Sequence, residues 1–79
     1  GFTGHLDFYV RVVAFPHLSH EARLSLVAER RGRLHAELGA LAAARDAVAG
    51  VSGHLELADL RARQLDAELG WLDDLERTL

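Results

Sequence analysis

Apolar residues at positions 6–15 surround almost the whole circumference of the helix that they would form. Only Asp7 and Arg11 interrupt them, as one polar strip. A helix that is apolar on nearly all sides is either buried or part of an interface. Pro16 disfavours helix at the residue before it, so the helix is predicted over residues 4–15. Because a chain of three helices cannot surround such a segment, we expect a partner to cover it.

In the middle of the chain, apolar residues recur every three and four positions, which is the seven-residue repeat of a coiled coil. The repeat is formed by Leu24, Val27, Leu34, Leu38, Leu41 and Val48, with Arg31 and Arg45 in the remaining places. A helix is predicted over residues 20–49, with Ser19 as its N-cap and Gly50 just after its last turn. An arginine in such a seam either meets a carboxylate or extends its charged end to water.

The third segment is predicted as a helix over residues 53–78, after a glycine-flanked turn in which Ser52 is a candidate N-cap. Its apolar residues spread over about half of the circumference, whereas a one-sided surface helix shows a stripe only slightly wider than about 100°. We therefore expect it to contact the long helix with one flank and another chain with the other. Arg61, Gln64 and Glu68 lie inside the apolar arc, and we expect them to form a polar network between subunits.

These patterns predict an all-α fold, in which a short apolar helix precedes two long antiparallel helices that dimerise through coiled-coil-like packing. A chain of 79 residues has a small core and usually needs a staple or a partner. Cysteine is absent, which excludes disulfides and thiolate zinc sites. The predicted dimer interface consists of Leu6, Tyr9, Val10, Val13, Leu57, Leu60, Gln64, Glu68, Trp71, Leu72 and Leu75.

Charge and hydropathy limit the partners and the cell compartment that we expect for the chain. A net charge of −3 argues against nucleic-acid binding by this segment alone, because phosphate contacts need clustered positive charge. No apolar run approaches the ~18 residues of a membrane span, and no secretory signal is recognisable. We therefore expect a cytoplasmic protein without membrane contact. The chain begins at Gly1 inside an apolar segment, so we also expect it to be part of a longer protein.

Histidine is the only residue type whose number, five, suggests metal binding or catalysis. His17 and His20 stand at a helix entrance rather than on one helical face, and the further ligands of a zinc site are missing. Ser19 and Ser52 are explained as helix caps, and neither a nucleophile elbow nor a phosphate-binding loop is present. Arg33 is expected to pair with Glu29 and Glu37 rather than with DNA. We expect no enzyme activity, no metal and no cofactor.

The apolar helix that ends at Phe15, the long helix after Pro16 and the closing run Ala67-Glu68-Leu69-Gly70-Trp71-Leu72 occur in the same order in a known family. The chain resembles the C-terminal domain of PadR-like transcriptional regulators, in the branch that includes a virulence-gene activator. The resemblance covers nearly the whole chain. It implies that residues 1–79 are a C-terminal dimerisation or effector domain and that helices are exchanged within a homodimer. It also implies an upstream winged helix-turn-helix domain that binds operator DNA.

Some PadR-like regulators respond to phenolic or drug-like ligands, so a small aromatic effector is a further expectation. Trp71 and Tyr9 either pack in an interface or line a pocket for such a compound. Two other readings remain open. MerR-like regulators also dimerise through a long C-terminal helix, although a third helix with Trp71 fits that pattern poorly. A free-standing helical adaptor without a DNA role is the other alternative.

Overall fold

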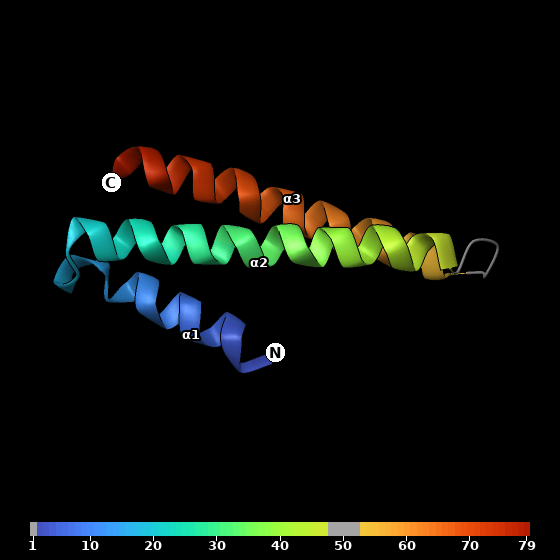
Figure 1. The fold of residues 1–79 in the computed structure, drawn as a ribbon, viewed down its shortest axis with the longest axis horizontal. Helices are drawn as coiled ribbons and strands as arrows, with labels where there is room; N and C mark the ends of the chain where they lie inside the picture. Colours follow the sequence, from blue (N-terminus) through green and yellow to red (C-terminus); the bar gives the residue numbers. More distant parts are fainter. Residues whose placement is uncertain (1, 48–52) are drawn as a thin grey trace.

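The computed structural model describes residues 2–47 and 53–79, with side chains from residue 8 onward in the first helix. Four elements follow one another: α1 (Phe2–Val13), a short 3₁₀ helix η1 (Phe15–His17), α2 (His20–Ala47) and α3 (His54–Thr78). Within this described part there is no strand. The predicted all-α fold, a short helix followed by two long helices that pack against each other, is therefore confirmed (Figure 1).

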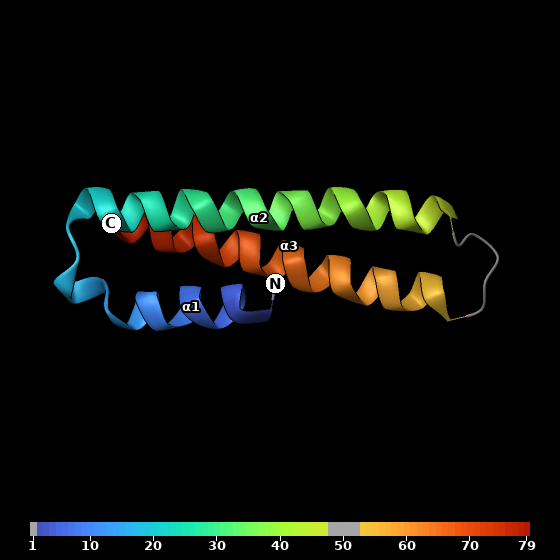
Figure 2. The ribbon, with the colours of Figure 1, turned by 60° about the horizontal axis from the view of Figure 1, so that its bottom comes forward.

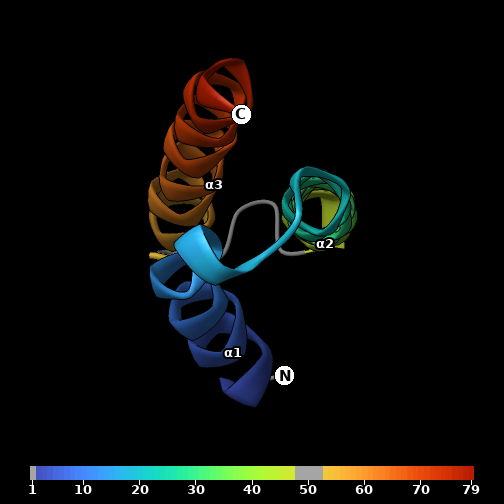
Figure 3. The same cartoon turned by 90° about the vertical axis from the view of Figure 1, so that its left-hand side faces the viewer.

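The two long helices form an antiparallel hairpin that determines the elongated shape, with principal extents of 48 × 24 × 15 Å. A helix of 28 residues is about 42 Å long, so α2 alone spans most of the long axis. The first helix lies along one half of this hairpin only, beside the beginning of α2 and the end of α3 (Figure 2). Seen along the long axis, α1 and α3 lie on the same side of α2 and diverge from each other (Figure 3).

The start of α2 matches its predicted cap. The Ala22 backbone N–H donates to Ser19 Oγ at 3.1 Å, which satisfies one of the donors left free in the first turn. The predicted end of the first helix was two residues too late, because residues 15–17 form η1 instead. Pro16 has no N–H to continue the α-helical hydrogen bonds, and Leu18 is extended with ψ 151°.

The third helix begins after Gly53, whose φ of 84° lies in the left-handed region that glycine adopts without a Cβ penalty. The Leu57 backbone N–H donates to the Gly53 carbonyl at 3.2 Å and closes the first turn. The predicted cap at Ser52, the predicted helix end at Gly50 and the seam residue Val48 lie outside the described residues.

The core is built by residues one heptad apart on facing helices. Val27 and Leu34 of α2 and Leu65 and Leu72 of α3 are the four fully buried side chains, and Phe8 and Phe15 complete the core over them. The seven-residue repeat predicted in the middle segment therefore faces α3 of the same chain. Leu24, Leu38 and Leu41 of that repeat are half-buried.

Candidate interaction surface

One buried arginine connects all three helices. Arg30 of α2 is only 3% exposed, and its guanidinium donates two hydrogen bonds to Glu68 of α3, at 2.6 Å from Nε and 3.1 Å from Nη2. Tyr9 of α1 donates its hydroxyl to the same carboxylate at 3.0 Å. A buried charge is tolerated only when it is paired and hydrogen-bonded. Glu68 therefore neutralises the charge of Arg30 on α2 and holds α1 through the hydroxyl of Tyr9.

Two aromatic rings of α1 cover the same guanidinium. The guanidinium carbon of Arg30, Cζ, lies 5.4 Å from the centroid of the Phe8 ring and 5.6 Å from that of the Tyr9 ring, within cation–π range. The two rings meet edge to face, with centroids 5.8 Å apart. The hydrogen bond to the Glu68 carboxylate raises the pKa of Arg30. The pKa of Tyr9 is raised mainly by burial and also by its hydrogen bond to Glu68. At neutral pH the arginine is thus charged and the phenol is protonated.

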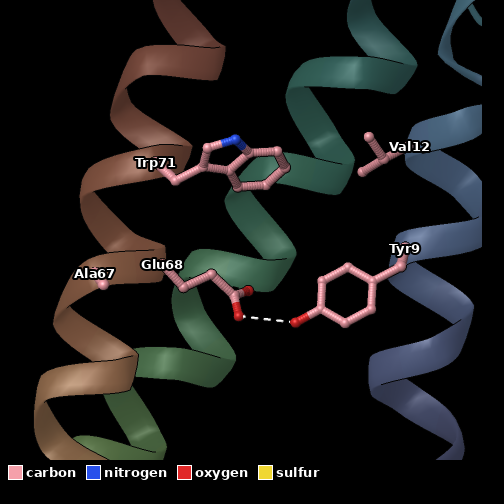
Figure 4. Close-up of a pocket in the computed structure, with 5 residues that line it drawn as sticks. All are labelled: Tyr9, Val12, Ala67, Glu68 and Trp71. Atoms are coloured by element: carbon pink, nitrogen blue, oxygen red, sulfur yellow. Dashed lines mark hydrogen bonds between the residues drawn. The ribbon is translucent and has the colours of Figure 1, made fainter.

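A cleft of about 490 Å³ opens between α1 and α3 beside this cluster. Tyr9 and Val12 line it from α1, and Ala67, Glu68 and Trp71 line it from α3. The Trp71 indole points toward Val12 across the cleft, and the bond between Tyr9 and Glu68 crosses its other end (Figure 4). Nearly all of the lining is apolar, and Glu68 is already bound by Arg30. Such a cleft suits an apolar side chain or a flat apolar compound.

Several large apolar side chains of α1 and α3 face solvent. Val13 is 81% exposed, Leu57 68%, Val10 66% and Leu60 53%, while Tyr9 and Trp71 are each 44% exposed. All six belong to the predicted dimer interface. They come from α1 and α3, and none comes from α2. Large exposed apolar side chains that gather on a surface mark places that meet a partner, so α1 and α3 are the candidate interaction surface.

The remaining predicted interface residues lie elsewhere. Leu72 is fully buried in the core of its own chain, so it has no surface left for a partner. Leu75 is half-buried and packs against that core, and Gln64 is exposed. The side chain of Leu6 lies outside the described residues.

The three residues of the predicted polar network all make hydrogen bonds within one chain. Arg61 donates to both carboxylate oxygens of Glu37 on α2, at 3.0 Å each from Nη2, and its Nη1 donates to Gln64 at 3.4 Å. Glu68 binds Arg30 instead of joining them. These partners on α2 were not predicted, because the spacing along the third segment does not show which charges of the long helix face it.

Of the two arginines in the middle repeat, Arg31 meets carboxylates. Its Nη2 donates to Asp73 and Glu76 of α3 at 2.8 Å each, and the side chain is 28% exposed. Arg45 is exposed near the end of α2. Arg33 pairs with Glu29 at 3.1 Å, as predicted, whereas its other predicted partner, Glu37, binds Arg61 of α3.

The described residues offer no group of three histidine or acidic side chains able to hold a metal ion. In the same part of the chain, no helix combines the length and apolar character needed to cross a membrane. Comparison of the chain with protein-family models, curated proteins and solved structures gives no match.

Proposed function

We propose that this chain is the homodimerisation domain of a cytoplasmic, bacterial PadR-like transcription regulator that binds operator DNA through an upstream winged helix-turn-helix domain. The observation that carries the proposal is the apolar surface of α1 and α3, where Val13 and Leu57 are 81% and 68% exposed. A small core beside such a surface is typical of a chain that completes its burial by association.

A stable dimer would cover a modest share of the surface of the chain. A specific interface buries about 800 Å² on each partner, and the chain exposes 5425 Å² in total. The interface would therefore take about one seventh of the surface. One long helix with a neighbouring short one can supply that share.

The dimer is tested by sedimentation and circular dichroism across a dilution series. We expect a mass of twice 8.7 kDa at micromolar concentration, with helical signal lost on dilution below the dissociation constant, because association stabilises the folded chain. A fully helical monomer at every concentration would contradict dimerisation. The regulator role is tested separately by the protein sequence encoded before Gly1, where any domain other than a helix-turn-helix would overturn it.

The apolar cleft supports a second candidate function, the binding of a planar aromatic effector. Trp71 is the only tryptophan of the chain and lines this cleft, so its fluorescence reports directly on occupancy. Titration with phenolic and fused-ring compounds should change its emission, and Val12→Glu should abolish the response by placing a charge in the cleft. His35→Glu, on the exposed face of α2, is the matched control. Emission that stays constant over a broad panel would rule out this use of the cleft.

A further inference from the structure

A second seam runs along α3 beside the one that faces α2. Its members follow steps of three and four along the helix and are all exposed: Leu57, Leu60, Gln64, Ala67 and Trp71. Residues with this spacing form one continuous stripe on a helix, which is the pattern that pairs with another helix in a coiled coil. The stripe is separate from Leu65 and Leu72, which are buried against α2.

The two halves of this stripe lie beside different neighbours. Its C-terminal half, Ala67 and Trp71, forms one wall of the cleft with α1. Its N-terminal half, Leu57 and Leu60, belongs to the end of the hairpin along which α1 does not run (Figures 1 and 2). The same helix thus carries a hollow at one end and projecting leucines at the other.

We infer that α3 pairs with α3 of a second copy in antiparallel orientation, with Leu60 of each copy seated in the other copy's cleft. The inference rests on the proposed dimerisation and specifies its geometry. Antiparallel pairing about a two-fold axis places the leucine of each copy in the cleft of the other. Both clefts are then filled, and the assembly is closed at two copies. Parallel pairing would set one hollow against the other and leave both empty.

Charge selects the register. With Leu60 opposite Trp71 of the second copy, Gln64 comes opposite Ala67, and the stripe is matched from Leu60 to Trp71. Leu57 then lies beyond the cleft, opposite Asp74. Beside the stripe, Glu56 of one copy then lies near Arg77 of the other. Opposite charges across an interface fix register, and like charges oppose it. Sliding the pair by one heptad in either direction sets like charges against each other, because identical residues then meet: Arg63 against Arg63, or Glu68 against Glu68.

Because the natural chain has no cysteine, single introduced cysteines report the pairing without background. Gln64→Cys and Ala67→Cys chains, carrying tags of different size, are co-expressed and mildly oxidised. Both positions are exposed, so the core of each chain is untouched. The inferred register brings these residues within disulfide reach, and a mixed-size product should form. Leu57→Cys is the matched single variant, and its two copies would stand about 25 Å apart along the antiparallel pair.

The expected result is roughly tenfold more mixed disulfide between the Gln64→Cys and Ala67→Cys chains than self-linked product of Leu57→Cys. Efficient self-linking of Leu57→Cys would show parallel pairing and overturn the inference. A dimer in sedimentation that forms neither disulfide would overturn this geometry while leaving dimerisation intact. A helical monomer for all variants and for the natural chain would overturn the inference together with the proposed function.

Discussion

At the scale of single residues, Arg30 does what a lysine could not do in the same place. Its planar guanidinium binds both oxygens of Glu68 and at the same time lies against the rings of Phe8 and Tyr9. A lysine ammonium is a compact, strongly hydrated charge and would leave one of these contacts unmade. The position of α1 therefore depends on a charged contact as well as on apolar packing.

Glu68→Gln should release this cluster. The amide keeps the shape but removes the counter-charge of the buried Arg30, so we expect the free energy of unfolding to fall by about 2 kcal/mol in urea denaturation. Glu29→Gln is the matched control, because Glu29 pairs with Arg33 on the exposed surface, where both side chains are more than half exposed. That change should alter stability by at most about 0.5 kcal/mol. Equal effects of the two substitutions would contradict a special role for the buried pair.

Tyr9 gives an independent measure of the same cluster, since it is the only tyrosine of the chain. Its raised pKa, caused by burial and by the hydrogen bond to Glu68, means that the folded state favours the protonated phenol. The stabilisation from this group is present below the usual tyrosine pKa near 10 and is lost as pH rises through the raised value. In Glu68→Gln, absorbance titration of Tyr9 should give a midpoint lower than in the natural chain. An unchanged midpoint would mean that Glu68 does not hold the phenol.

At the scale of elements, the sequence predicted the helices well because Pro16 and the glycine-flanked turn separate three segments and the middle one has a single dominant apolar spacing. That spacing predicted the burial of Val27 and Leu34, and the position of Ser19 before the segment predicted the cap. The same repeat could not distinguish Arg30 from Arg31. With about 3.6 residues per turn, positions three and four residues after Val27 both lie near the seam. The structure buries Arg30 and leaves Arg31 at the edge, where it meets carboxylates.

Periodicity also cannot say which helix a seam faces. The wide apolar arc of the third helix indicated two neighbours, and the structure supplies one of them, α2, which covers Leu65 and Leu72. Leu72 is buried in its own chain while the adjacent Trp71 is 44% exposed, because the two side chains lie about 100° apart around the helix. Leu57 and Leu60 remain uncovered. Only the packing of the folded chain separates core from outer surface here.

At the scale of the whole molecule, substitutions of buried and of exposed apolar residues should have different effects: the first should lower the stability of the single chain, and the second should weaken association. Leu72→Ala removes a fully buried side chain and leaves a cavity in the hairpin core, which should lower the free energy of unfolding by about 2–5 kcal/mol. Trp71→Ala removes a side chain that is 44% exposed in the single chain, so the core should survive. If Trp71 anchors the second copy, its loss should weaken association by about 2 kcal/mol, or roughly thirtyfold in the dissociation constant.

Dilution distinguishes the two effects. Stability that comes from association depends on protein concentration, whereas the contribution of a core side chain does not. Urea unfolding followed by circular dichroism should therefore show a defect in Leu72→Ala at every concentration. The defect in Trp71→Ala should be largest at high concentration, where the natural chain gains most from pairing, and should shrink on dilution. A Trp71→Ala defect of constant size would place the indole in the core of one chain and remove the main anchor of the proposed dimer.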